Sequence, residues 1–147
     1  MCVGQAADVF GTGIVAGAFY MGCIAVHPAS ATLSAAAQLK LRQQLIRRLA
    51  RYLPPFMFLP VFASVFAILM CRMSVVWGLD VLGLALSLAT IAITIAVNAP
   101  LNRHFATWVP DALPKDWETY VNRWNVAHRA RTTTATAAFV CAVLAGS

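Results

Sequence analysis

The chain has 147 residues, of which 61% are hydrophobic and 11% are charged, and its formal net charge is +6. Because soluble domains average about 25% charged residues, this composition excludes an ordinary soluble protein and predicts an integral membrane protein that forms a single domain over residues 1–147. The positive charge does not indicate a nucleic-acid partner, since the basic residues lie in connectors beside apolar segments and not on a soluble basic face.

The four cysteines are scattered along the chain and form no C-x-x-C pair. Neither a thiol oxidoreductase nor a thiolate zinc site therefore has the spacing that it needs. We interpret all four as small apolar packing residues: Cys2, Cys23, Cys71 and Cys141.

The first apolar segment, residues 9–26, predicts a retained transmembrane helix. It carries Asp8 at its start and lacks the basic beginning and the cleavage pattern of a signal peptide. We expect Pro28 to end this helix. One helical face about 80° wide should pack against neighbouring helices and carry its polar members inward. Its members are Gly13, Gly17, Tyr20, Ile24 and His27.

Residues 29–53 are basic but keep an apolar residue at every fourth position from Ala37 to Leu49. This pattern predicts an amphipathic helix at the membrane surface, and a solvated connector is the alternative. Pro54 and Pro55 then restart the chain, and residues 55–71 form the second span, in which neighbouring helices compensate for Pro60.

The third span is expected at residues 75–97, after a tight turn formed by Arg72, Met73 and Ser74. Asp80 is the one acidic residue inside an apolar run, a position that often carries function. Because it lies within two turns of the interface, we favour a helix-end residue that reaches water or Arg72.

The last segment has no proline or glycine between Lys115 and Ala145, so we predict one long helix that is capped near Asp116 and contains the fourth span, residues 126–146. Upstream, Pro100 is expected to end or kink a membrane helix between Asn98 and Asn102. One face of the long helix, about 80° wide, gathers aromatic, basic and small side chains. It comprises Trp117, Val121, Trp124, His128 and Arg131, continued by Ala135, Ala138 and Ala142.

The predicted fold is therefore all-α, a four-helix transmembrane bundle with an amphipathic surface helix between spans one and two. All Lys and Arg residues except Arg72 lie in the first and third connectors. The positive-inside rule makes those connectors cytoplasmic and places both termini of this multi-pass protein on the non-cytoplasmic side. Polar residues from three spans then converge at the cytoplasmic mouth of the bundle. They are His27, Asn98, Asn102, Trp124, His128 and Arg131.

A metal or cofactor site has little support in the sequence. His27, His104 and His128 include no pair at i, i+4 and no Glu-x-x-His partner, so we expect no metal. Bis-histidine haem ligation by His27 and His128 across the bundle stays open as an alternative. Motifs for nucleotides and flavins are absent from the sequence, so we expect no cofactor.

The cluster instead combines indole, amide, imidazole and guanidinium groups, which suit proton abstraction from a weakly acidic aromatic substrate. The structural alternative is an interfacial aromatic belt with basic anchors and helix-capping asparagines. We favour the belt for Trp108 and Trp117, and a functional site for the remaining residues.

The third connector and the fourth helix resemble those of the DUF1772 or anthrone oxygenase-like family of membrane proteins, with a weaker match at His27-Pro28. The resemblance rests on Asn98-Ala-Pro-Leu-Asn102, Arg123-Trp124, His128 and Arg131. It implies a cofactor-independent monooxygenase of polyketide biosynthesis that uses O2 to oxidise an anthrone to a quinone, without metal or flavin.

Under that activity we expect His128 to remove the acidic methylene proton. Arg131 with Asn98 or Asn102 would hold the enolate oxygen. Trp124 would stack on the fused rings, and His27 and Tyr20 would complete the substrate site. The partners would be a hydrophobic aromatic molecule, O2 and the lipid bilayer, and a homo-oligomer is compatible with the sequence.

The alternative function belongs to another class. It is a non-enzymatic membrane protein that binds a lipid or a hydrophobic metabolite, or assists the assembly of a partner.

Overall fold

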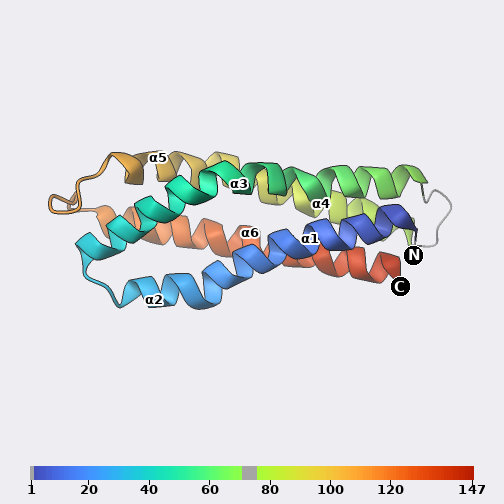
Figure 1. Cartoon of the computed structure of the whole chain (residues 1–147), viewed down its shortest axis with the longest axis horizontal. Coiled ribbons are helices and arrows are strands. Elements are labelled where there is room, and N and C mark those ends of the chain that lie inside the picture. The colour runs from blue at the N-terminus through green and yellow to red at the C-terminus, as the bar shows by residue number, and fades with distance from the viewer. Residues whose placement is uncertain (1, 71–75) are drawn as a thin grey trace.

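The computed structural model describes residues 2–70 and 76–147, and within them the chain forms four long helical rods (Figure 1). The first rod joins α1 (Val3–Met21), the π-helical segment η1 (Gly22–Val26) and α2 (His27–Ala31), and the second is α3 (Ala35–Met70). The third joins α4 (Trp77–Ile93), the π-helical η2 (Thr94–Asn98) and α5 (Ala99–Thr107), and the fourth is α6 (Trp117–Gly146).

The rods run up and down along the bundle, with both termini at one end and the turn at residues 32–34 at the other (Figure 1). Helices α1 and α4 each pack against both α3 and α6. The end opposite the termini consists of α2, the first half of α3, α5 and the first half of α6. We call it the basic end, because every Lys and Arg among the described residues belongs to these segments or to the connector before α6. This arrangement confirms the expected all-α bundle.

Three of the rods are long and apolar enough to cross a membrane: Val3–Ala31, Ala35–Met70 and Trp77–Thr107. The fourth rod, α6, is not among them, since its first half carries many polar and basic residues. Three of the four expected spans thus have support from length and composition, and the fourth, residues 126–146, stays a prediction.

The expected break at Pro54 and Pro55 is wrong, because α3 runs through both prolines and Pro60 as one helix of 36 residues. The two adjacent prolines remove hydrogen bonds to the carbonyls of Ala50 and Arg51, which lie on an exposed stretch of the helix where water can replace them. The surface helix at residues 29–53 is therefore not a separate element. The beginning of α3 packs into the bundle, where Gln38, Leu39 and Arg42 are buried.

The predicted helix end at Pro28 is also wrong, and the helix does not end at Pro100, where either an end or a kink was expected. Each proline follows a π-helical segment, and the backbone amide just before it bonds five residues back, from His27 to Gly22 and from Ala99 to Thr94. Since a proline ring in a regular helix clashes with the carbonyl four residues earlier, the wider π turn accommodates it and the helix continues.

Helix α6 begins and faces the bundle as the sequence predicts. Asp116 is its N-cap residue, although its side chain makes no capping hydrogen bond. The inward stripe is confirmed from Trp124 onward, while Trp117 and Val121 are half-buried. Its buried members include Trp124, His128, Arg131, Ala135, Ala138 and Ala142.

Near the termini the interior contains two acids. Asp8 and Asp80 are each 1% exposed, and Ser64 donates a hydrogen bond of 2.8 Å to Oδ1 of Asp8. Asp80 lies in the first turn of α4 as expected, where the helix dipole favours a carboxylate, but its burial contradicts the expected contact with water. Its other expected partner, Arg72, lies with the predicted turn at residues 72–74 outside the described residues.

The cysteines differ from one another in their roles. Cys23 and Cys141 are free, half-buried and buried respectively, as expected of packing residues. Cys2 is disulfide-bonded, so its interpretation as a packing residue is wrong. Scattered spacing carries no information on which ends of a bundle meet, and Cys71 lies outside the described residues.

Candidate functional site

The indole of Trp124 is the centre of a ring cluster at the basic end. It stacks on the imidazole of His128, with centroids 4.9 Å apart and planes 17° from parallel. The imidazole of His27, from α2, makes T-shaped contacts with Trp124 and with His128, with ring centroids 4.8 Å and 4.7 Å apart. Three aromatic rings from two rods thus form one continuous contact surface.

Arg131 fixes the orientation of His128. Its Nε and Nη2 atoms lie 3.1 Å and 3.0 Å from Nδ1 of His128, one helical turn away, and its Nη1 donates to Oγ1 of Thr94 at 3.3 Å. Because a guanidinium can only donate, Nδ1 must be the acceptor, and the proton of a neutral His128 ring is then on Nε2. That Nε2 is buried, and the backbone of Phe19 lies near the imidazole.

The two asparagines hold Trp124 from the third rod. The indole Nε1 donates to Oδ1 of Asn102 at 2.8 Å, and Nδ2 of Asn98 donates to the backbone carbonyl of Trp124 at 3.3 Å. Asn98 is fully buried, and it lies at the end of the π-helical segment one turn before Asn102. Both side chains therefore reach α6 because the helix continues through Pro100.

Gly22 makes room for the two imidazoles where α1 passes α6. A Cβ atom at this position would lie 2.6 Å from Nε2 of His128 and 3.6 Å from Nε2 of His27. The first of these distances is too short for any side chain larger than hydrogen. The absence of a side chain at Gly22 is thus a condition for the contact between the two histidines.

A second guanidinium, that of Arg42 from α3, covers the other side of the cluster. Its Cζ atom lies 4.6 Å from the ring centroid of Trp124 and 4.8 Å from that of Phe105, in cation–π geometry. Arg131 makes the same type of contact, with Trp124 at 5.4 Å and with Phe19 at 4.4 Å. Two buried cations therefore flank one indole, and the hydrogen-bond partners of Arg131 are an imidazole and a hydroxyl, not a carboxylate.

A cavity of about 220 Å³ opens beside this cluster, between α2, α3 and α6. His27 brings the ring cluster to its wall, and Arg42 and Gln38 approach from α3. The cavity is lined by His27, Ser30, Ala31, Gln38, Arg42, Trp117, Glu118, Val121, Asn122 and Asn125. Its volume is below the ~300 Å³ at which typical ligand pockets begin, so its ligand is small or projects partly from the opening.

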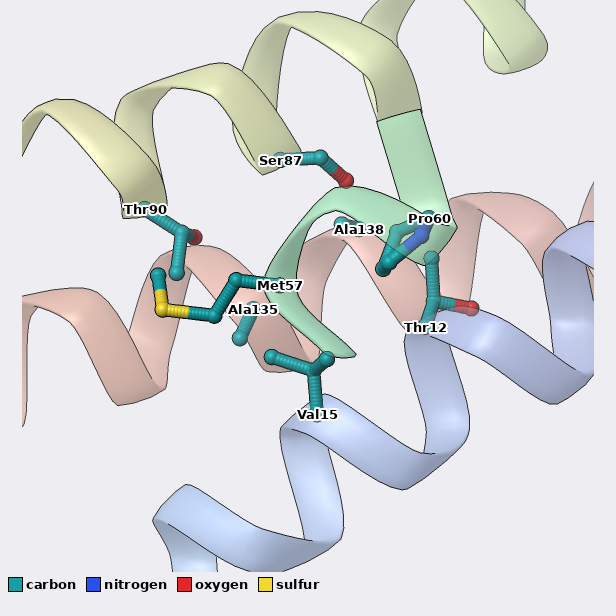
Figure 2. Close-up of a pocket in the computed structure, with 8 residues that line it drawn as sticks. All are labelled: Thr12, Val15, Met57, Pro60, Ser87, Thr90, Ala135 and Ala138. Carbon is teal, nitrogen blue, oxygen red and sulfur yellow. The ribbon is translucent and has the colours of Figure 1, made fainter. Parts of the chain in front are cut away.

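A second cavity lies in the middle of the bundle and is far smaller, about 10 Å³. Figure 2 shows its lining, in which the Met57 side chain extends toward Thr90, while the hydroxyl of Thr12 points away from the other lining residues. The space is at the lower limit for one water molecule, so it excludes an organic substrate.

The structure brings most of the predicted site together, with one exception. Tyr20 is 54% exposed on the outside of α1. His104, one of the three histidines considered for metal binding, is exposed and pairs with Tyr120 at 5.7 Å instead. Among the described residues, no group of three or more His, Cys, Asp or Glu side chains gathers that could hold a metal.

Sequence reasoning assigned two other residues of this region to a different environment. Arg42 was included only among the basic residues of the predicted surface helix at residues 29–53, and Trp117 was expected in an interfacial belt. The structure buries Arg42 against Trp124 and places Trp117 in the cavity wall. One available signal was the spacing of Gln38 and Arg42, which puts two polar side chains on one helical face beside Leu39.

Comparison with known proteins places this arrangement in a family. No curated protein and no solved structure matches the chain. A family model described as anthrone oxygenase matches residues 5–141, which include both π-helical segments and every residue of the ring cluster. The chain therefore belongs to the anthrone oxygenase family.

Proposed function

We propose that the protein oxidises an anthrone-type aromatic substrate to the corresponding quinone with O2 and without a cofactor, in the cavity at the basic end. The observation that carries the proposal is the position of His27, which lines a cavity and also contacts the buried pair of His128 and Trp124. Membership of a family named for oxygenase activity supports an enzymatic role.

His27 is the better general base of the two histidines in this geometry. The Nδ1 lone pair of His128 already accepts hydrogen bonds from Arg131, which leaves a neutral His128 only its Nε2–H group, a donor. A base must have a free lone pair within reach of the substrate proton, and His27 lines the cavity where the substrate would lie. We therefore assign proton abstraction to His27 and not, as the sequence suggested, to His128.

The reaction balances without a further reagent. His27 takes one methylene proton, and the enolate transfers an electron to O2, so that the radical pair combines to a carbon-bound peroxide. Protonated His27 returns its proton to the peroxide. Loss of the second methylene proton to His27 then cleaves the O–O bond, which leaves the new carbonyl and releases hydroxide. That hydroxide takes the proton from His27 and becomes water.

The charge of the site favours the enolate intermediate. Arg42 and Arg131 place two guanidinium groups beside Trp124, where low exposure to water strengthens their field. In this scheme Asn98 and Asn102 are positioning residues for Trp124, because their hydrogen bonds go to its backbone and its indole.

The site also fits a substrate that comes from the bilayer. A membrane span needs about 20 residues. That length counted forward from Val3 ends at Gly22, and the same length counted back from Gly146 ends at Ala127. The ring cluster therefore lies at the membrane boundary. We propose that this boundary is the cytoplasmic one, because the described Lys and Arg residues gather there.

The proposal is tested by supplying purified protein with an anthrone and heavy-isotope O2. The mechanism requires one labelled oxygen atom in the quinone carbonyl and the other in water, at a rate above that of the uncatalysed oxidation. Binding of the anthrone without label transfer above that rate would instead support the non-enzymatic alternative, a membrane protein that binds a hydrophobic metabolite.

A further inference from the structure

The wall of the cavity contains polar atoms that the described protein leaves without partners. Nη1 of Arg42 and Oε1 of Gln38 are buried and have no hydrogen-bond partner within the described chain, and the same holds for Oδ1 of Asn125. Arg42 and Gln38 are 8% and 9% exposed. A buried polar atom without a partner costs about 1–3 kcal/mol, so three of them around one cavity call for an explanation.

The chemistry of these atoms defines what would satisfy them. The free atom of Arg42 is a charged donor, which calls for an oxyanion or a carbonyl oxygen. The free atom of Gln38 is an acceptor, and its orientation is fixed because Nε2 donates to the Ser30 carbonyl at 3.2 Å. It calls for a hydroxyl. Since the two residues are one helical turn apart on α3, both ligand oxygens must lie close together.

We propose that Arg42 and Gln38 form the recognition group for the substrate, which presents an ionisable oxygen to Arg42 and a neighbouring hydroxyl to Gln38. The flat apolar part of the ligand lies against Trp117 and Val121 on the opposite wall, and the oxygens determine which aromatic compounds bind. Glu118, the one acidic residue in the lining, is exposed at the rim and disfavours an anion there. This orients the negative oxygen toward Arg42.

This assignment rests on the proposed function but concerns binding, so it is tested without turnover. The probe is an anthraquinone with two neighbouring hydroxyls, a compound of the product class, titrated into purified protein under nitrogen while tryptophan fluorescence is recorded. Its dimethyl ether serves as the matched ligand, because methylation of both oxygens removes the ionisable oxygen and the hydroxyl donor. Wild-type protein should bind the hydroxylated probe more tightly than the ether.

Arg42→Gln should weaken binding of the hydroxylated probe by roughly 10- to 100-fold, the value of a hydrogen bond to a charged group, and should change binding of the ether by less than about twofold. Arg47→Gln is the matched control, since Arg47 lies on the same helix but is exposed outside the cavity. Gln38→Leu should weaken the hydroxylated probe by roughly 3- to 10-fold, and Gln44→Leu, also exposed on α3, should leave it unchanged.

Equal losses for both probes in Arg42→Gln would overturn the assignment, because they would show that Arg42 only supports the packing of Trp124 and Phe105. Equal affinities in the Arg42 and Arg47 variants would also overturn it. If Arg42→Gln does not fold, Arg42→Lys and Gln38→Leu provide the same comparison. Probe binding without oxygenation would leave this assignment intact and reject the proposed function. Oxygenation at an unchanged rate in both Arg42→Gln and Gln38→Leu would leave the proposed function intact and reject this assignment.

Discussion

At the scale of single residues, the two histidines of the cluster have different roles because their nitrogens have different neighbours. Two nitrogens of Arg131 lie against Nδ1 of His128, and the stacked indole of Trp124 fixes its plane. His27 has no such clamp from a guanidinium and lines the cavity. We therefore propose that His128 is a positioning residue that acts through Arg131 and His27.

This difference predicts losses of activity of different size for two amides at position 128. His128→Asn keeps an acceptor close to the position of Nδ1, so Arg131 retains a partner and kcat should fall by less than about tenfold. His128→Gln places its oxygen near the position of Nε2 and leaves the guanidinium without that acceptor, so kcat should fall further, by roughly 10²-fold. Steady-state quinone formation by both variants, with melting temperatures in the same detergent, provides the comparison. If both amides abolish turnover equally in folded protein, His128 itself is the base.

The sequence predicted the types of residue in the site better than their contacts. Trp124, His128 and Arg131 lie one turn apart on a regular helix, so the helical period alone was enough to place them together. The role of Asn102 was not predictable, since its partner is an indole on another rod. The sequence also could not predict which ring nitrogen of His128 accepts a hydrogen bond from Arg131, because that depends on how the two side chains pack.

At the scale of elements, the π-helical segment η1 decides which face of the first rod enters the site. The predicted stripe extended a regular 3.6-residue period from Gly13 to His27, and it placed Tyr20 inward. A π-helical turn contains an extra residue, which rotates everything after it by roughly 100° relative to a regular helix. Tyr20, before η1, therefore faces outward although His27, after it, faces the cluster.

Gly22, the first residue of this segment, gives a matched pair of substitutions with Gly17. Gly22→Ala puts a methyl group into His128, whose ring cannot easily move because Arg131 and Trp124 hold it. It should destabilise the protein by about 1–3 kcal/mol and lower kcat by at least about tenfold. Gly17→Ala meets no atom within 4 Å and should be neutral or stabilise by up to about 1 kcal/mol.

Thermal melting and kcat of both glycine variants provide the measurement. Equal behaviour of the two would show that the close approach of η1 and α6 at Gly22 is not required for the site.

The continuous length of α3, like the π-helical turn η1, could not be predicted from local sequence signals. Local proline signals predicted breaks, whereas packing in the bundle and water at the exposed turn keep the helix continuous.

At the scale of the whole molecule, the bundle separates two chemically different ends. The basic end carries the ring cluster, the cavity and the described cations, while the other end carries both termini and the buried carboxyls of Asp8 and Asp80. Cys2 is disulfide-bonded near the N-terminus, and disulfides persist in oxidising compartments. Both features favour an orientation with the basic end in the cytoplasm. The up-and-down order followed from hydropathy in the sequence, whereas burial of the two carboxyls did not.

This orientation predicts different labelling of two exposed serines changed to cysteine. Ser147→Cys, at the C-terminus, should react with a membrane-impermeant maleimide in intact cells. Ser34→Cys, in the turn of the basic end, should react only after permeabilisation. The unsubstituted chain gives the background from its own cysteines. Labelling of Ser34→Cys from outside would invert the topology without affecting the site itself.

The most direct measurement of the central claim is the initial rate of O2 uptake by purified protein with an anthrone, compared between wild type, His27→Gln and His104→Gln. Wild-type protein should take up one O2 for each quinone formed. His27→Gln should lose about 10²–10⁴-fold of that rate, the usual contribution of a general base. His104→Gln, an exposed histidine outside the cluster, should stay within about twofold of wild type. A folded His27→Gln variant that takes up O2 as fast as wild type would contradict the account.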